Sequence, residues 1–415
     1  MAESGPLLGH TLDLTIGPPA HGGSCVARHE GRAVFVRHTL PGERVRALVT
    51  EDRGGAFCFA DAVEILAASL DRVVAPCRFA GPGACGGCDW QHVAGAAQRA
   101  LKATVVRDQF TRLAHLDVTG LLAGVEELPG GLLGWRTRNI YAVDRTGAPG
   151  LRRHRSHEIV HVDACLLGAE HVGDAAALAD SWPGLTGVEV ARGDGVEVTL
   201  LAHRPGPGRQ ARGRRPPDRV DVVAGPQTLA HRVLDREFEV AAGGFWQVHP
   251  AAAETFARAL LDTVAPRPGE TVIDLYAGAG ALTAALAGAV TATGHVISLE
   301  SHPAAVADAQ RNLADLPWVE VQRGRVEPAA IEALGVRPDV IVLDPPRAGA
   351  GRAVLEALLA QRPRVIGYVA CDPAALARDV ATATAQGWRL TALRAFDAFP
   401  MTHHVECVAS LEPPA

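Results

Sequence analysis

The sequence contains a single lysine, Lys102, and its other basic residues are arginines. Alanine, glycine and proline are abundant, a bias typical of a GC-rich genome. Arginine clusters are therefore weak evidence of a nucleic-acid partner in this chain. The formal net charge of −6 does not indicate such a partner either. Local stripes of positive charge still matter, because a stripe can bind phosphates even where the total charge is negative.

The sequence also lacks a run of about 18 uncharged apolar residues, and it lacks a basic leader followed by an apolar stretch. We therefore expect no membrane-spanning segment, no export and a cytoplasmic location. Apolar residues make up 48% of the 415 residues, which excludes a disordered chain. The length predicts roughly two to four domains, each large enough to bury its own core.

The sequence pattern of residues 1–66 predicts short strands separated by Gly and Pro turns, at the close spacing of a small barrel. The expected strands are Thr11–Ile16, Ala33–Arg37, Arg44–Val49 and Phe57–Ile65, with a tight turn at 41–43. We interpret this region as a five-stranded oligonucleotide-binding (OB) barrel that binds RNA. A barrel with a purely structural role is the alternative.

A central region, residues 67–245, begins with a Gly-rich loop that holds Cys77, Cys85 and Cys88. Three cysteines in such a loop favour metal ligation over disulfides in a cytoplasmic protein. The candidate for the fourth ligand is Cys165, which follows an expected strand at 159–162. The spacing leaves a structural zinc site and a [4Fe-4S] cluster equally open. The remaining cysteines outside the C-terminal motifs fit buried free thiols better: Cys25, Cys58 and Cys407.

The central region also carries two arginine stripes and one helical segment. The first stripe is Arg152, Arg153 and Arg155, and the second is Arg204, Arg209, Arg212, Arg214, Arg215 and Arg219. The second is rich in Gly and Pro, so a flexible solvated loop is as good an interpretation as a phosphate-binding arm. Periodicity predicts a helix over about 93–115, which is a candidate to pack on the C-terminal domain.

Residues 246–415 alternate strands and helices as a doubly wound α/β sheet does. Strands are expected at 271–275, 296–299, 319–322, 340–343 and 365–370, with helices from about 281 and over 374–381. Polar or reactive residues directly follow these strands: a Gly-rich turn at 274–280, Glu300, Asp344 and Cys371. Open α/β sheets bind ligands at the carboxyl ends of their strands, so these residues form one candidate site.

Each motif has a functional and an ordinary interpretation. The Gly-rich turn followed by Glu300 suits a nucleotide with a ribose diol, and it also occurs in dinucleotide binders. Asp344-Pro345-Pro346 fixes the chain after a carboxylate, a device for holding a planar base, although an ordinary turn is the alternative. Cys371 precedes a helix whose N-terminus would favour its thiolate; otherwise it is a core cysteine.

Glu406 lies between apolar neighbours in the segment 402–407. Burial would raise the pKa of its carboxyl and suit it to act as a base or proton relay. A metal site on His403 and His404 is the rival interpretation, but adjacent histidines point apart on a strand. A cysteine, a base and a nucleotide-type turn predict methylation at carbon 5 of a pyrimidine. Carbon 5 becomes nucleophilic only after a thiolate has added at carbon 6.

In these motifs and their order the chain resembles the RNA uracil-5 methyltransferases, in the branch with an N-terminal TRAM domain and an iron-sulfur cluster. The resemblance covers nearly the whole length, and its motifs are the barrel, Cys-x7-Cys-x2-Cys, Phe245-Trp246-Gln247, Asp274-Leu275-Tyr276-x-Gly278-x-Gly280, Glu300, Asp344-Pro345-Pro346-Arg347, Cys371-Asp372-Pro373 and His404-Val405-Glu406. It implies a Rossmann-like methyltransferase domain over 246–415, a TRAM barrel over 1–66 and an α+β iron-sulfur domain over 67–245.

The resemblance also implies residue roles. Cys371 would be the nucleophile and Glu406 the base. Gln247, Tyr276 and Glu300 would contact S-adenosylmethionine, with Asp344 at the junction of cofactor and target base. The metal centre would be a [4Fe-4S] cluster, with zinc less favoured, on Cys77, Cys85, Cys88 and Cys165. Three departures from the family pattern, at His249, Arg325 and Ala370, bear on cofactor affinity and on a hydrogen bond beside the nucleophile.

The implied activity is formation of 5-methyluridine in RNA by a monomeric enzyme, on large-subunit ribosomal RNA or alternatively on transfer RNA. A radical S-adenosylmethionine enzyme is a rival, but it expects Cys-x3-Cys-x2-Cys, whereas the first spacing here is seven. A non-catalytic RNA-binding iron-sulfur protein is the second rival. Such a protein would need neither Cys371 nor Glu406.

Overall fold

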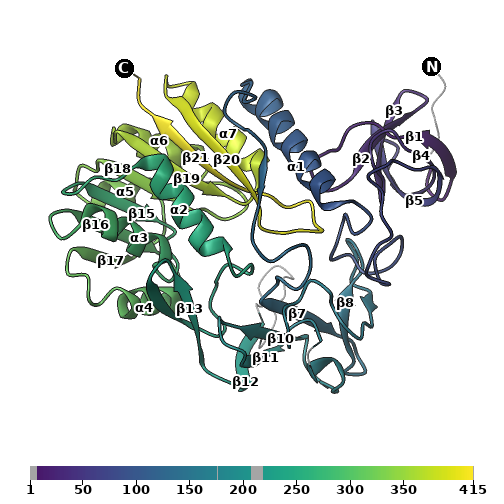
Figure 1. Ribbon diagram of the computed structural model, residues 1–415, viewed down its shortest axis with the longest axis horizontal. Coiled ribbons are helices and arrows are strands. Elements are labelled where there is room, and N and C mark those ends of the chain that lie inside the picture. The colour runs from purple at the N-terminus through teal and green to yellow at the C-terminus, as the bar shows by residue number, and fades with distance from the viewer. Residues whose placement is uncertain (1–6, 175, 207–217, 415) are drawn as a thin grey trace.

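The computed structural model describes residues 7–174, 176–206 and 218–414. Its strands form four sheets of five, six, two and eight strands (Figure 1). Within the described residues, no helix has the length and apolar character needed to cross a membrane. Four arginines of the second stripe lie outside the described residues: Arg209, Arg212, Arg214 and Arg215.

The N-terminal sheet contains five strands in the order β1-β4-β5-β3-β2. Their bounds are β1 Thr11–Thr15, β2 Cys25–His29, β3 Arg32–Arg37, β4 Arg44–Asp52 and β5 Phe57–Ala67. Buried and exposed residues alternate along β1 and β4, as expected for a sheet with one face on a core. The four predicted strands are confirmed, as is the turn at 41–43, where Gly42 has φ 84°. The fifth strand, β2, was not predicted, and closure into a barrel stays a prediction.

The central sheet contains six strands in the order β12-β11-β10-β7-β8-β9, and neighbouring strands are antiparallel. Their bounds are β7 Arg138–Val143, β8 Pro149–Arg152, β9 Ile159–Val160, β10 Gly187–Arg192, β11 Val198–Arg204 and β12 Arg219–Ala224. A 3-10 turn covers Ala176–Leu178. A hairpin of β13 Thr228–Val233 and β14 Arg236–Ala241 leads to the C-terminal sheet.

The C-terminal sheet has eight strands in the order β17-β16-β15-β18-β19-β21-β20-β6. The bounds are β6 Val125–Glu127, β15 Thr271–Leu275, β16 His295–Glu300, β17 Val319–Arg323, β18 Val340–Leu343, β19 Val365–Ala370, β20 Arg389–Asp397 and β21 Glu406–Glu412. Strands β15 to β19 are parallel, and β21 is antiparallel to both of its neighbours. The predicted strands of this region are confirmed, and this order agrees with the doubly wound fold.

Helices cover both faces of this sheet, which explains why β18 and β19 are buried along their whole length. The helices α2 Ala252–Val264 and α3 Ala281–Val290 share a core with one face. The helices α5 Pro328–Ala333, α6 Arg352–Ala360 and α7 Pro373–Thr384 share a core with the other. A further helix, α4 Pro303–Asn312, packs beside β14 and β17.

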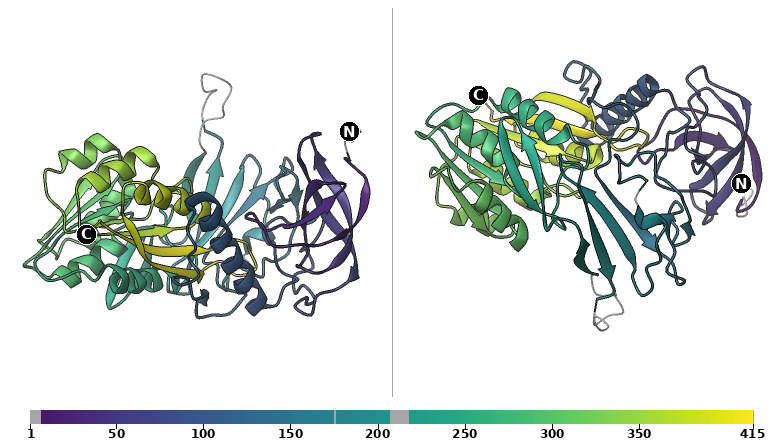
Figure 2. Two further views of the ribbon diagram at one scale, coloured as in Figure 1. Left: turned by 90° about the horizontal axis from the view of Figure 1, so that it is seen from above. Right: turned by 60° about the horizontal axis from the view of Figure 1, so that its bottom comes forward.

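The helix α1 spans Gly95–Gln109 and continues as a π-helical turn over Phe110–Ala114, as predicted for 93–115. It contributes Val106 and Phe110 to the core that contains α7. β6, a little further along the chain, adds to the edge of the eight-stranded sheet. Residues 95–127 therefore lie against the C-terminal sheet, between it and the N-terminal sheet (Figure 2). The domain boundaries at 66 and 245 stay predictions.

Candidate active site

The predicted site residues meet at one edge of the eight-stranded sheet. Four of them lie at the carboxyl ends of parallel strands: Glu300 ends β16, and Tyr276, Asp344 and Cys371 directly follow β15, β18 and β19. Leu275 pairs with Leu299 on one side and with Leu343 on the other, so the strands end level with one another. This edge is where open α/β sheets bind their ligands.

The Gly-rich turn after β15 needs unusual backbone conformations. Tyr276 and Gly278 have φ values of 62° and 57°. Gly280 has φ 91°, and a Cβ at this position would come within 2.9 Å of Leu313. The Glu300 carboxylate accepts hydrogen bonds at 2.6–3.1 Å from the backbone amides of Gly278 and of Ser301 and His302, which follow β16. Glu300 therefore joins the turn to the next strand.

Asp274 is a site residue that the sequence interpretation did not single out. Its side chain is fully buried, and its Oδ2 accepts a hydrogen bond of 2.5 Å from the Thr283 hydroxyl. Its Oδ1 is buried without a hydrogen-bond partner among the described residues. Burial raises the pKa of Asp274 to about 7, and the Glu300 carboxylate adds to the increase. The signal was present, since Asp274 opens the Gly-rich motif.

Asp344 and the loop that follows it are held by a buried network. Burial and the nearby Asp274 carboxylate raise the pKa of Asp344 to about 7. Beyond the two prolines, the Asp379 carboxylate accepts hydrogen bonds from the Tyr368 hydroxyl at 2.6 Å and from the Ala350 amide at 2.8 Å. A Cβ at Gly349 would lie 2.7 Å from the same carboxylate. Asp379 therefore fixes the loop from α7, a role that sequence reasoning missed.

Cys371 and Glu406 lie at the ends of two paired strands. Ala370 of β19 is opposite Cys407 of β21, which places Cys371 and Glu406 next to this pair. Asp372 caps α7 through a 2.7 Å hydrogen bond from the Ala375 amide. Burial and the carboxylates of Glu406 and Asp344 raise the pKa of Cys371 to about 12. Burial and the two carboxylates therefore outweigh any lowering of this pKa by the helix N-terminus.

Glu406 is almost fully buried, and burial raises the pKa of its carboxyl well above the usual range, as predicted. The Asp344 carboxylate adds to this increase, and the exposed Arg347 opposes it. Arg347 also opposes the increase at Cys371. Arg347 is therefore the cation that faces the nucleophile and the base together, a position that the sequence motif contained but did not explain.

The segment before Glu406 is a loop that is anchored from the central region. His403 is hydrogen-bonded to the buried Asp89 through both its backbone amide, at 3.1 Å, and its Nδ1, at 2.7 Å. The rings of His403 and His404 lie 4.1 Å apart between centroids. The expectation that these histidines point apart on a strand is wrong, because β21 begins only at Glu406.

Gln247 is half-buried in the segment between β14 and α2. Its neighbour Trp246 stacks on His231 with 4.5 Å between ring centroids. His249 is buried and stacks on Trp135, and burial lowers its pKa to about 4. His249, which departs from the family pattern, is therefore a neutral ring packed against Trp135. Contact of Gln247 with a cofactor stays a prediction.

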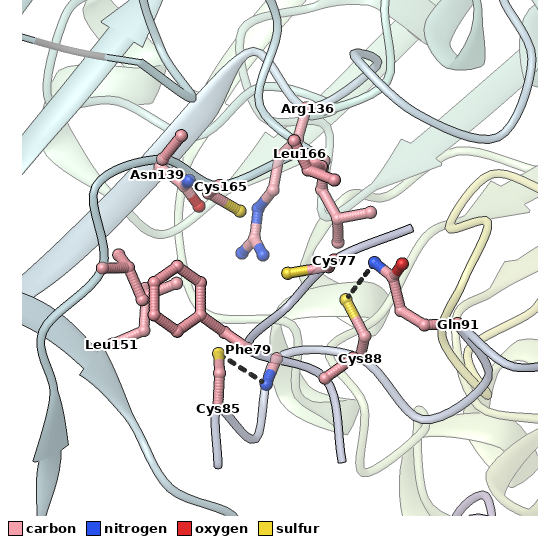
Figure 3. Close-up of a pocket in the computed structure, with 15 residues that line it drawn as sticks. Cys77, Phe79, Cys85, Cys88, Gln91, Arg136, Asn139, Leu151, Cys165 and Leu166 are labelled. Atoms are coloured by element: carbon pink, nitrogen blue, oxygen red, sulfur yellow. Dashed lines mark hydrogen bonds between the residues drawn. The ribbon is translucent and has the colours of Figure 1, made fainter. Parts of the chain in front are cut away.

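The four predicted metal-ligating cysteines line one small cavity of about 50 Å³. Cys77, Cys85 and Cys88 come from one loop, and Cys165 comes from a second loop far along the chain (Figure 3). Two sulfurs accept hydrogen bonds: Cys85 from the Gly87 amide at 3.4 Å and Cys88 from the Gln91 amide group at 3.3 Å. The Arg136 side chain points into the same cavity.

Within the described ranges, no group of three or more His, Cys, Asp or Glu side chains is arranged to hold a single metal ion. The cavity nevertheless presents four thiols, together with N–H groups directed at sulfur. Cysteine thiolates with such hydrogen bonds are the donor set of an iron-sulfur cluster. The residues present therefore fit a [4Fe-4S] cluster.

The fold and the site define a class: a Rossmann-like methyltransferase domain with a cysteine and buried carboxyl groups at the carboxyl edge of its sheet. A family model described as tRNA (uracil-5-)-methyltransferase matches residues 329–413. A TRAM domain model matches residues 7–63. The chain is 47% identical to an uncharacterized RNA methyltransferase of Streptomyces coelicolor over 100% of this chain and 95% of the relative. It is 37% identical to one of Bifidobacterium longum over 93% of each chain.

The chain therefore belongs to the RNA uracil-5 methyltransferase family and carries a TRAM domain. Among solved structures, it is similar to the Pyrococcus abyssi tRNA (uracil-54, C5)-methyltransferase in complex with S-adenosyl-L-homocysteine. That similarity has a TM-score of 0.70 and 20% sequence identity, and it covers 96% of this chain and 100% of the other. At this identity the similarity shows the fold alone.

Proposed function

We propose that this RNA methyltransferase methylates carbon 5 of uridine in RNA, with S-adenosylmethionine as the methyl donor. The observation that carries the proposal is the position of Cys371 beside Glu406, at the ends of paired strands and next to Asp344. Gln247, Tyr276, Glu300 and Asp344 are the proposed cofactor contacts. The Pyrococcus abyssi structure, whose bound ligand is S-adenosyl-L-homocysteine, supports that choice of cofactor.

In the proposed mechanism, the target uridine flips out of the base stack, because the enzyme cannot reach carbon 5 and carbon 6 of a stacked base. The Cys371 thiol loses its proton to solvent, and its Sγ adds as a thiolate to carbon 6. The electrons of the carbon 5–carbon 6 double bond then form an enolate that is nucleophilic at carbon 5. S-adenosylmethionine supplies an electrophilic methyl group at that atom when it is bound. The Glu406 carboxylate then removes the carbon 5 proton, and elimination releases the Cys371 thiolate.

The protonation states follow from the local charges. Burial and the neighbouring carboxylates favour the neutral thiol of Cys371, because they raise its pKa to about 12. Deprotonation of Cys371 becomes easier when Glu406 and Asp344 are protonated, since their carboxylates raise that pKa. Glu406 then gives its own proton to solvent before it acts as the base. A cationic sulfonium held at this edge would also lower the pKa of Cys371, by the same Coulomb effect. Burial raises the pKa of Glu406 well above its usual range, which makes its carboxylate a stronger base than an exposed one.

The test uses RNA that contains 5-fluorouridine, with Cys371→Ala, Glu406→Gln and the barrel variant Cys58→Ala as a control. The wild-type enzyme should form an adduct that resists denaturing electrophoresis, because carbon 5 then carries no removable proton. Cys371→Ala should give no adduct with any RNA, whereas Cys58→Ala should behave as wild type. Glu406→Gln should trap a methylated adduct with ordinary uridine.

Two outcomes would change the assignment. Turnover by Cys371→Ala would overthrow the nucleophile. An inactive Glu406→Gln without an adduct would move Glu406 from proton removal to positioning of the base. Methyl incorporation from labelled cofactor into uridine-containing RNA separates an enzyme from a non-catalytic RNA-binding protein.

The proposed substrate is large-subunit ribosomal RNA, and transfer RNA is the alternative. The match to a family described for tRNA favours transfer RNA. The four-cysteine cavity, together with a TRAM domain, favours ribosomal RNA. Mapping 5-methyluridine in total RNA from a deletion strain decides between them, since the missing position identifies the RNA.

A [4Fe-4S] cluster is the proposed occupant of the four-cysteine cavity, with Cys77, Cys85, Cys88 and Cys165 as its ligands. The cavity lies in the loops that anchor the segment before Glu406, because Asp89 directly follows Cys88 and binds His403. We assign the cluster to folding and RNA docking. Electron transfer has no place in the methyl-transfer mechanism above.

A further inference from the structure

A wide groove runs between the N-terminal sheet and the loop that carries the first arginine stripe. Its volume is about 690 Å³, within the roughly 300–1,000 Å³ typical of ligand pockets. It is lined by β3, β5, the loop before β2, the Cys85 loop and residues 153–158. None of its lining residues takes part in the chemistry proposed above.

One wall of the groove is aromatic. Phe35, Phe57 and Phe59 project from the outer face of β3 and β5, with ring centroids 5.5–5.7 Å apart. Phe57 is 51% exposed, although it is a large apolar side chain. The Arg155 guanidinium lies over the Phe59 ring at 4.7 Å. Aromatic faces beside an arginine plane are the surfaces on which unstacked bases bind.

The floor of the groove holds a buried cation. Arg37 is only 8% exposed, and its Nη2 makes no hydrogen bond within the described part of the chain. That nitrogen lies 3.6 Å from Asp89 Oδ1. The rim also carries acidic residues, but the exposed Arg153 pairs with Glu158 and the exposed Arg155 with Glu51, at 2.5 and 4.0 Å. Exposed pairs of this kind contribute little and can open for a ligand.

One lining residue of the groove contacts the residue that follows the nucleophile. His21 lines the groove, and the His21 Nε2 is 3.0 Å from Asp372 Oδ2. Asp372 directly follows Cys371. A strand of RNA that delivers a base to Cys371 can therefore extend along His21 into the groove.

We propose that this groove binds an unpaired nucleotide of the RNA substrate near the target uridine, with its base on Phe57 and Phe59 and its phosphate at Arg37. The inference rests on the proposed function for its substrate class. It adds a specific site on the TRAM sheet for a nucleotide that is not methylated. The occupant is single-stranded RNA, because paired bases present no free face to the rings.

The experiment measures binding of fluorescein-labelled decauridylate to the full-length protein by anisotropy, at several salt concentrations. The double variant Phe57→Leu/Phe59→Leu should bind about tenfold or more weakly with an unchanged salt slope, because stacking is lost and charge is not. Arg37→Gln should weaken binding and reduce the slope of log affinity against log salt by about 0.7, the value for one phosphate contact on a single strand. Arg37→Lys keeps the positive charge, so it should keep the wild-type salt slope. If it does, the weaker binding of Arg37→Gln comes from the lost charge and not from misfolding.

Two control variants lie on the same sheet outside the groove. Val63→Ala replaces an exposed apolar residue of β5, and Arg46→Gln removes an exposed arginine of β4. Both should bind decauridylate within about twofold of wild type. Binding by Phe57→Leu/Phe59→Leu that matches the controls would overturn the proposal, as would a wild-type protein that fails to bind decauridylate.

Methyl incorporation keeps the two proposals separate. With total RNA from a deletion strain, the aromatic variant should raise the KM for RNA and leave the KM for S-adenosylmethionine unchanged. A wild-type protein that binds decauridylate but transfers no methyl group would sink the proposed function and leave the groove standing. A variant with normal RNA KM and normal decauridylate binding would sink the groove alone.

Discussion

At the scale of residues, the site is defined by carboxyl groups that burial keeps close to neutral. Asp274 and Asp344 each have a pKa of about 7, and the pKa of Glu406 is raised well above its usual range. The cause is the same in each case: desolvation opposes the charged form, and each group has an acidic neighbour. Such a cluster lowers the stability of the native state as pH rises, because its charged forms are disfavoured.

Asp274 allows a direct test of that cost. Its folded-state pKa of about 7 exceeds an unfolded value of about 3.9, so the native state binds the extra proton. The resulting stabilisation is full below pH ~3.9 and is lost as pH rises through about 7. A shift of about three units corresponds to at most about 4 kcal/mol. We expect Asp274→Asn to gain stability relative to wild type between pH 5 and pH 8.

Thermal melts at several pH values check this expectation. The difference in Tm between Asp274→Asn and wild type should grow towards pH 8. Asp117→Asn, at an exposed carboxyl group, is the control, and its difference from wild type should not grow in this way. A difference for Asp274→Asn that stays constant with pH would mean that this carboxyl group is already ionised at pH 5.

The sequence predicted the position of residues well where a motif ends a strand. Glu300 ends β16, and Asp344 and Cys371 follow β18 and β19, so the meeting of these residues at one edge follows from the fold class. Their roles stay predictions. The pKa of Cys371 could not be predicted, because it depends on carboxylates from β18 and β21 that come close only in the folded sheet. The same holds for Asp379, which reaches the 345–351 loop from α7.

At the scale of elements, the loop before β21 is held mainly from α1. Gln98 binds Met401 through a 2.8 Å hydrogen bond that its Oε1 accepts from the Met401 amide. One turn further along the helix, the Lys102 Nζ lies 2.5 Å from Asp397 Oδ1 and 3.0 Å from the Phe399 carbonyl oxygen. The only lysine of the chain is thus fully buried beside the active-site loop.

Removing that cation should leave a buried carboxylate without its partner. We expect Lys102→Met to destabilise the protein by about 3–5 kcal/mol, the usual cost of breaking a buried ion pair from one side. Lys102→Met/Asp397→Leu should recover most of the loss, because neither charge remains. Denaturant unfolding measures both values.

Arg99→Met on the same helix is the matched control. Arg99 pairs with Glu127 at 3.0 Å, and the glutamate side chain is about half exposed. Loss of this ion pair should lower the free energy of unfolding by about 1 kcal/mol or less. If Lys102→Met cost no more than Arg99→Met, the buried pair would not be what holds the loop.

Two elements show where prediction from periodicity stops. β2, Cys25–His29, was missed because its inward positions are Cys25 and Ala27, whose small side chains make a weak apolar signal. β6 has three residues, too few for any period, and it is a strand only because β20 offers an edge. The long helix over 95–114 was found because its apolar face is repeated over several turns.

At the scale of the whole molecule, the four-cysteine cavity and the active site share one connecting segment. The backbone amides of Asp89 and Trp90 both donate to the Met401 carbonyl oxygen at 3.0 Å. The Asp89 side chain binds His403, and Arg37 of the N-terminal sheet lies beside that same carboxylate. These contacts connect the cysteine loop to the loop before Glu406 and to the floor of the RNA groove. We therefore expect disorder in the cysteine loop to loosen the other two segments.

This connection predicts what loss of the cysteine ligands does. Protein purified without oxygen should be brown with a broad charge-transfer absorbance, and Cys165→Ser should lose iron, colour and solubility together. Cys58→Ser, at a buried thiol of the N-terminal sheet, should keep iron and colour. Because Asp89 adjoins Cys88, amide hydrogen exchange at 399–405 should become faster in Cys165→Ser than in Cys58→Ser. Colourless wild-type protein with stoichiometric zinc would replace the cluster by a zinc site, whereas unchanged exchange at 399–405 would separate the metal centre from the active-site loop.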